Sequence, residues 1–165
     1  MNFREKILSR EALPDWRKSL REQRKKLVFT NGCFDILHLG HVSYLEAARN
    51  EGDALLVAVN GDASVRAIKG PNRPINSEVD RAEVIAALAS VDGVVIFQEE
   101  NALRLLSLVQ PDIYAKGGDY TLATINQEER RLVEKQGGKV VVVSGIEGKS
   151  TTTLIESLKL HLLNR

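Results

Sequence analysis

The chain has 165 residues, of which 43% are hydrophobic, so it is long enough to bury the core of one domain. Its 23 basic and 22 acidic residues nearly cancel, which excludes the broad positive field that nonspecific nucleic-acid binding needs. A single cysteine excludes an intrachain disulfide, and no apolar run resembles a signal peptide or a membrane span. We therefore expect a cytoplasmic protein with no nucleic-acid or membrane partner.

The first 25 residues differ in pattern from the rest of the chain. Residues 4–25 carry scattered apolar positions among charges, with Pro14 as an interruption, which predicts two short helical pieces. We interpret residues 1–25 as an N-terminal helical appendage and residues 26–165 as the main domain.

From residue 27 onward, short apolar segments alternate with amphipathic ones. The aliphatic run 55–59 is typical of a parallel strand that is covered on both faces. The alternation predicts a single α/β domain, a doubly wound parallel sheet of Rossmann-like type, whose ligands bind at the carboxyl ends of the strands where the strand order reverses. The expected strands are residues 27–30, 55–59, 91–97, 113–115 and 140–143. The expected helices are residues 40–50, 80–89, 102–109, 127–136 and 151–163.

One polar cluster, residues 31–41, follows the first expected strand and leads into a helix. His38 and His41 are three residues apart at the helix start, so their rings can lie on one side, and Gly40 lets a ligand approach the backbone. Together with the free N–H groups of a helix N-terminus, they would hold a polyphosphate and donate hydrogen bonds to oxygens that gain charge. A pair of half-exposed helix histidines, or part of a metal site, fits the same spacing.

Two further clusters are loops that carry cations. The Pro/Gly loop 69–76 offers Lys69 as a counter-charge for a triphosphate and Arg73 as a ligand for a substrate phosphate, although such a loop is often only solvated. Residues 116–120 combine two glycines with Lys116, Asp119 and Tyr120, which suits a nucleoside pocket or a plain turn.

The last cluster, residues 147–153, lies between the last expected strand and the last helix. Its four consecutive hydroxyl residues exceed what helix capping needs, so Ser150 is the expected N-cap and its neighbours candidate phosphate ligands. Asp62, which follows the second strand, is either a helix cap or a substrate ligand.

In this order the clusters resemble the nucleotidyltransferase superfamily with the His-x-Gly-His signature, here His38-Leu39-Gly40-His41. Within it, residues 25 to the end are similar to the heptose 1-phosphate adenylyltransferases. The resemblance implies transfer of AMP from ATP to D-glycero-β-D-manno-heptose 1-phosphate, with Mg²⁺ as the cofactor, for lipopolysaccharide core synthesis. It also implies a homo-oligomer. In many bacteria the similar domain is the second half of a bifunctional protein whose first half is a sugar kinase, and the resemblance implies that this chain is the stand-alone form.

The resemblance also implies site residues by matching position. His38, His41 and Lys69 would be catalytic and contact the reacting phosphates. The implied nucleotide-binding residues are Asn31, Gly32, Cys33, Phe34, Gly40, His41, Lys116, Gly118, Asp119, Ser150, Thr151 and Thr152. The implied substrate-binding residues are Asp35, Asp62, Lys69 and Arg73, and no metal ligand is assigned.

Two alternatives remain open at this level. One is a cytidylyltransferase acting on glycerol 3-phosphate or another phosphorylated acceptor. Related cytidylyltransferases carry arginine where this chain has Gly145 and isoleucine where it has Lys149, which disfavours CTP. The other is a noncatalytic nucleotide-binding module, which the intact histidine pair disfavours.

Overall fold

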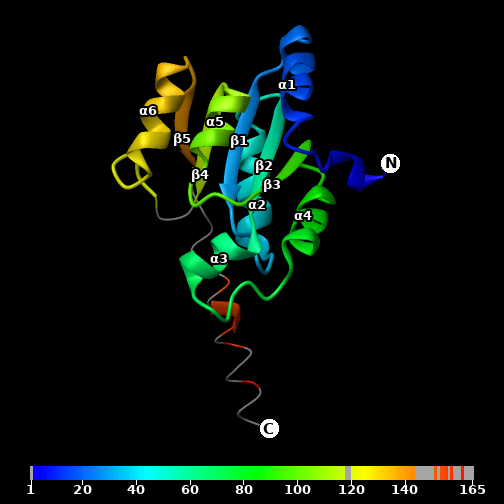
Figure 1. The fold of residues 1–165 in the computed structure, drawn as a ribbon, viewed down its shortest axis with the longest axis vertical. Helices are drawn as coiled ribbons and strands as arrows, with labels where there is room; N and C mark the ends of the chain where they lie inside the picture. Colours follow the sequence, from blue (N-terminus) through cyan, green and yellow to red (C-terminus); the bar gives the residue numbers. More distant parts are fainter. Residues whose placement is uncertain are drawn as a thin grey trace.

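The computed structural model describes residues 2–117, 120–143, 151, 153–155, 157 and 161. Five parallel strands form one sheet in the order β3-β2-β1-β4-β5 (Figure 1). The strands are β1 (Leu27–Gly32), β2 (Ala54–Asn60), β3 (Gly93–Phe97), β4 (Ile113–Gly117) and β5 (Lys139–Val143). The helices are η1 (Phe3–Lys6), α1 (Leu13–Glu22), α2 (Leu39–Arg49), α3 (Asp62–Lys69), α4 (Glu78–Ala86), α5 (Leu103–Val109) and α6 (Gln127–Lys135).

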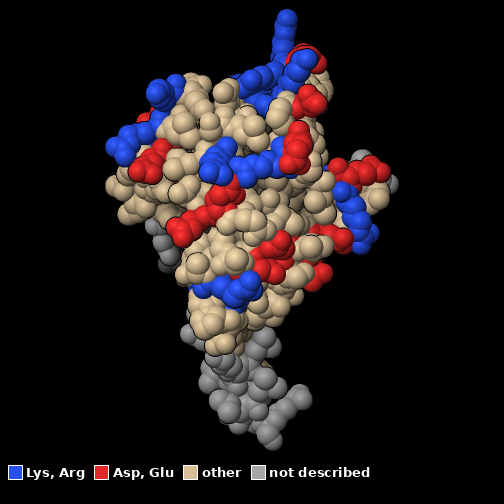
Figure 2. Space-filling model, viewed as in Figure 1, with Lys and Arg blue, Asp and Glu red and all other residues tan. Residues whose placement is uncertain are grey.

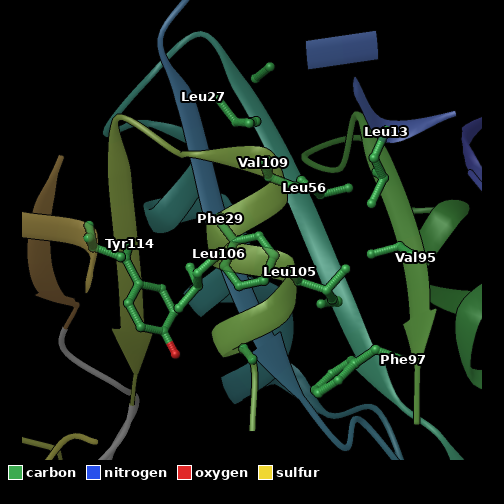
Figure 3. Close-up of a cluster of buried hydrophobic side chains, with 14 of the residues drawn as sticks. Leu13, Leu27, Phe29, Leu56, Val95, Phe97, Leu105, Leu106, Val109 and Tyr114 are labelled. Atoms are coloured by element: carbon green, nitrogen blue, oxygen red, sulfur yellow. The ribbon is translucent and has the colours of Figure 1, made fainter. Parts of the chain in front are cut away.

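Helices cover both faces of the sheet, which confirms the predicted doubly wound α/β fold. On one face, β-strand side chains such as Phe29 and Leu56 pack against α1, α5 and α6. Figure 3 shows Leu105 and Leu106 of α5 against this face. On the other face, the strands pack against α2 and α4. Because β2 is buried along its whole length, its unbroken aliphatic run follows from having a helix layer on each side.

The sheet reverses its strand order between β1 and β4. The chain passes outward from β1 to β2 and β3, then returns to β4 on the other side of β1. The carboxyl ends of β1 and β4 therefore border the crevice where such sheets bind ligands. In Figure 1 the strand arrows point toward the end of the molecule where α3 lies, and α1 ends at the opposite end.

The N-terminal segment packs directly on the sheet. Leu13 and Leu20 of α1 are buried in the core cluster, and the amide of Leu8 donates to the carbonyl of Val94 at 2.8 Å. The two predicted helical pieces are present as η1 and α1. The division of the chain at residue 25 stays a prediction.

One helix, α3, lies where the sequence pattern predicted only a polar cap and a loop. It begins after Gly61, with Asp62 as its first residue rather than its cap, and it ends at Lys69 before Gly70, whose φ is 97°. Lys69 is thus helical, and the loop begins one residue later than predicted. Within the described part of the chain, no helix is long and apolar enough to cross a membrane.

Candidate active site

The site begins in the turn that leaves β1. Phe34 has a φ of 47° and turns its ring back under Gly32, where a Cβ atom would lie 2.9 Å from that ring. A side chain at position 32 would therefore force the Phe34 ring to shift. The Phe34 ring is buried in the core and its centroid lies 5.4 Å from that of His41, in an edge-on arrangement. The turn thus supplies a rigid support for one histidine.

His38 and His41 come together as the sequence predicted. His38 is the N-cap residue of α2, and its carbonyl accepts from the amide of His41 at 2.9 Å. The two ring centroids are 3.9 Å apart with 30° between the ring planes. Both rings therefore lie together at the start of α2, beside the carboxyl end of β1.

Burial sets the protonation state of His41. It lowers the pKa of His41 to about 4, with a contribution from His38 in the same direction, while a hydrogen bond with the Ile36 carbonyl opposes the shift. The imidazole is therefore neutral at physiological pH, and its single N–H group can donate to one partner at a time, either the Ile36 carbonyl or a ligand. A neutral donor next to the helix N-terminus suits an oxyanion better than it suits general acid catalysis.

Asp35 closes the loop 70–76 onto the turn. One carboxylate oxygen accepts from Nε of Arg73 at 2.5 Å, and the other accepts from the amides of Ile75 and Asn76 at 2.8 and 3.0 Å. Burial by itself would raise the pKa of Asp35, but these hydrogen bonds outweigh it and lower the pKa. Both Asp35 and Arg73, which were predicted as substrate ligands, are thus paired with each other.

Arg81 of α4 is a buried arginine that links three segments near the site, and it was not predicted from the sequence. It donates to the carbonyls of Cys33 and Asn76 and, at 2.9 Å, to Oδ1 of Asp62. Its side chain has no exposed surface. Asp62, predicted as a cap or a substrate ligand, therefore forms an ion pair with Arg81. The only sequence signal was a basic residue on the inner face of an amphipathic helix.

The predicted nucleotide residues Asn31 and Lys116 meet across the point where the strand order reverses. Nζ of Lys116 donates to Oδ1 of Asn31 at 2.8 Å, and the hydroxyl of Tyr114 lies 2.8 Å from the same oxygen. Burial lowers the pKa of Lys116, and the nearby Glu129 carboxylate acts in the opposite direction. Lys116 thus joins the ends of β1 and β4.

Tyr114 and Glu129 complete this network and were not predicted. The Tyr114 hydroxyl approaches Oε2 of Glu129 at 2.7 Å, and Oε1 of Glu129 accepts from the amide of Ala102 at 2.8 Å. Oε2 also lies 3.8 Å from Nζ of Lys116. Figure 3 shows the Tyr114 hydroxyl directed toward the end of the sheet where the arrowheads lie. Desolvation raises the pKa of Tyr114, so its hydroxyl stays protonated.

Tyr44 of α2 bridges the same two strands from the other face. Its hydroxyl shares a 2.7 Å hydrogen bond with Thr30 and donates to the carbonyl of Ala115 at 3.0 Å. Its ring occupies the space above Gly117, where a Cβ atom would lie 2.4 Å away. Gly117 therefore allows α2 to pack close to β4.

Some of the remaining predicted site residues lie within the described part of the chain, and others lie outside it. Oγ1 of Thr151 donates to the carbonyl of Ile36 at 3.3 Å, which places Thr151 beside the histidine turn. Lys69 is exposed at the end of α3, and Cys33 is half-buried, with burial raising the pKa of its thiol. Gly40 lies in the first turn of α2. Gly118, Asp119, Ser150 and Thr152 lie outside the described residues.

No protein cage for a metal ion is formed by the described residues. Among them, no group of three His, Cys, Asp or Glu side chains comes together. A magnesium ion is commonly held by substrate phosphates, water and one or two carboxylates, so this finding is compatible with a metal that arrives with the nucleotide.

The parallel sheet, the histidine pair and the lysine at the strand-order reversal define a nucleotidyltransferase-type site. Residues 29–159 match the family described as cytidylyltransferase-like. The chain is 47% identical over 158 residues to the bifunctional protein HldE of Syntrophotalea carbinolica, covering 96% of this chain and 32% of that protein. It is 52% identical over 139 residues to the bifunctional protein HldE of Mesorhizobium japonicum, covering 84% and 28% of the two chains. The chain thus spans about a third of the length of these relatives.

Solved structures agree with the fold and the family. The lipopolysaccharide core biosynthesis protein of Thermoplasma volcanium is 31% identical, with a TM-score of 0.62, covering 76% of this chain and 99% of that chain. The pantoate-beta-alanine ligase of Francisella tularensis is 14% identical with a TM-score of 0.55, covering 96% and 79% of the two chains, and shares the fold. The chain belongs to the cytidylyltransferase-like family and is a nucleotidyltransferase. Members of this family generally use a divalent metal ion with the nucleotide.

Proposed function

We propose that the chain transfers AMP from ATP to D-glycero-β-D-manno-heptose 1-phosphate and releases pyrophosphate. The observation that carries the proposal is the stacked pair of His38 and His41 at the start of α2, next to the strand-order reversal. The identity to HldE proteins and the likeness to a lipopolysaccharide core biosynthesis protein support the sugar phosphate as acceptor and the product's use in core synthesis.

In this reaction an oxygen of the sugar phosphate attacks the α-phosphorus of ATP, a new P–O bond forms, and the bond to the bridging oxygen breaks. The attacking phosphate is already an anion, so the site needs no base and works by positioning and charge stabilisation. His41, neutral because its pKa is about 4, donates a hydrogen bond to an oxygen of the α-phosphate as charge shifts toward pyrophosphate.

The surrounding residues have roles that follow from their positions. The ammonium group of Lys116, held between Asn31 and Glu129, lies where the nucleotide would cross the end of the sheet. Lys69 extends from the end of α3 as a cation for the triphosphate or the sugar phosphate. Mg²⁺ would be held mainly by the phosphates and would neutralise part of their charge. Asp35 and Arg73 act by holding the loop 70–76 in place.

Other parts of the proposal rest on the family resemblance alone. They include nucleotide contacts by the undescribed residues Gly118, Asp119, Ser150 and Thr152, and by the backbone of residues 32–34 and 40. They also include sugar contacts by Asp62, assembly as a homo-oligomer in the cytoplasm, and the division into residues 1–25 and 26–165.

Pyrophosphate release across a grid of nucleotides and acceptors tests the proposal. ATP, CTP and GTP would each be combined with heptose 1-phosphate, glycerol 3-phosphate and flavin mononucleotide. We expect turnover only for ATP with heptose 1-phosphate. Turnover with CTP and glycerol 3-phosphate would replace the proposal by a cytidylyltransferase, and no turnover in any pair would favour a noncatalytic nucleotide-binding module.

A substitution of His41 tests the mechanism. His41→Ala should lower kcat about a hundredfold or more, the loss typical of one oxyanion donor. The matched control is His161→Ala, which removes an exposed helical histidine whose Nδ1 contacts the Ser157 carbonyl, and it should leave kcat unchanged. A wild-type kcat in His41→Ala would remove this ring from the mechanism.

A further inference from the structure

A polar pocket lies at the end of the molecule opposite the histidine pair. Its volume is about 290 Å³, and it is bordered by the end of α1, the segment 24–26 and the segments that precede β4 and β5. Because β1, β4 and β5 all begin there, the pocket is separated from the candidate active site by the length of the sheet. We call it the basic pocket, after its cations Arg17, Arg21, Arg24, Lys25 and Lys26.

The basic pocket carries more positive charge than its own residues neutralise. The only acid among the residues that line it is Asp112. Oδ2 of Asp112 is already occupied, since it accepts from Nη2 of Arg17 at 3.0 Å and from the amide of Leu27 at 2.7 Å. Figure 2 shows Lys and Arg side chains gathered at the end of the molecule where α1 ends, with acids beside them. The pocket has five cations and one carboxylate, so at least four of the cations have no acidic partner among the residues that line it.

Arg17 makes this imbalance costly because its side chain is 95% buried, with a relative exposure of 5%. Its Nε and Nη2 atoms donate to the carbonyls of Val109 and Gln110 at 3.1 and 3.0 Å, whereas the buried Nη1 atom has no hydrogen-bond partner. Burial lowers the pKa of Arg17, and the charge of Arg21 lowers it further against the opposing effect of Asp112. A guanidinium nevertheless stays protonated at neutral pH, and Asp112 is the one carboxylate among the lining residues that balances its charge.

The chain also adopts an unfavourable backbone conformation to place cations at this pocket. Arg24 has a φ of 57°, in the left-handed region that usually takes glycine or asparagine after a helix. The amide of the next residue, Lys25, donates to the carbonyl of Leu20 at 2.9 Å. Arg24 therefore lies in the turn that ends α1. An arginine in this position adds a charge where glycine would have served the backbone better.

We propose that the basic pocket binds a small phosphorylated anion. Arginine and lysine together are the usual ligands of phosphate oxygens, through the guanidinium fork and the point charge of the ammonium. The volume is at the lower end for ligand pockets, which favours a small phosphate ester or inorganic phosphate over a whole nucleotide. Bound there, the anion would neutralise the exposed cations and offset the buried charge of Arg17. This site does not depend on the function proposed for the histidine pair.

Titration with inorganic phosphate, followed by amide NMR spectra of the whole chain, tests the proposal. The reporters are the amides of Gly137 and Gly138, which line the basic pocket and lie far from the histidines. We expect their resonances to shift saturably with phosphate and not with sodium chloride at equal ionic strength. Equal or linear shifts with both salts would mean general charge screening and would overturn the proposal.

Paired variants locate the binding. Arg24→Gln/Lys25→Gln should weaken phosphate binding at least tenfold, as loss of one or two charge-assisted contacts implies. The matched control Lys18→Gln/Arg104→Gln removes one lysine and one arginine that are exposed and lie outside the pocket, and it should bind like the wild type. Wild-type binding in the pocket variant, or equal weakening in both variants, would overturn the proposal. Well-dispersed spectra of each variant establish that it is folded.

Discussion

The depressed pKa of His41 predicts a specific loss of stability in mild acid. The unfolded chain takes up a proton on this histidine near pH 6.5, whereas the folded chain does so only near pH 4. Between these values the unfolded state binds more protons, so stability is complete above about pH 6.5 and falls as the pH approaches 4. The two pKa values give a loss of about 2 kcal/mol between pH 7.5 and pH 5 for a fully desolvated ring. Since the ring is only partly buried, solvent screening reduces the expected loss to about 1 kcal/mol.

Comparison with His41→Gln isolates this contribution from that of the carboxylates. Chemical denaturation at pH 7.5 and pH 5 should give a smaller pH-dependent loss for His41→Gln than for the wild type, by about 1 kcal/mol. An NMR titration of the ring carbon should show no protonation of His41 above about pH 5. Equal losses in the two proteins, or a ring that titrates near pH 6.5, would refute the argument that burial keeps His41 neutral.

Three further substitutions probe the supports of the site. Asp35→Asn should lower the free energy of unfolding by about 1.5 to 3 kcal/mol, as expected for losing charged hydrogen bonds, and make the loop that it holds more sensitive to proteolysis; unchanged denaturation would argue against this clamp. Glu129→Gln should raise the KM for ATP severalfold with little change in kcat, because Lys116 loses its carboxylate neighbour; an unchanged KM would exclude this positioning role. Gly117→Ala should destabilise the fold by about 1 to 3 kcal/mol through a clash with the Tyr44 ring, and a double-mutant cycle with Tyr44→Ala should show much of that cost relieved.

The sequence was sufficient for the layer architecture because burial on both faces of a parallel sheet leaves a direct pattern. The aliphatic run of β2 and the alternation of strands with helices predicted the fold. The histidine pair was also within reach of sequence reasoning, since His38 and His41 are neighbours on one helix. Their distance depends on local helix geometry, which a spacing of three residues determines.

The prediction was incomplete where contacts join residues that are distant in the chain. Arg81 reaches Cys33 across 48 residues and Tyr114 reaches Asn31 across 83 residues, and neither pairing leaves a local pattern. Helix α3 was missed because its eight residues begin without a side-chain cap and run into a Pro/Gly loop. Asp35 was expected at the substrate, but its partners in the loop 70–76 became visible only in the folded chain.

The sequence by itself determined the strands, most of the helices and the place of the histidines at a strand end, since periodicity and spacing are local properties. The tertiary structure alone decided the charge of His41, because its pKa depends on burial by residues brought in from elsewhere. It also decided which predicted ligands are paired within the chain, and that five cations near the end of α1 surround one pocket. These properties are set by desolvation and by charges close in space, which the order of residues does not reveal.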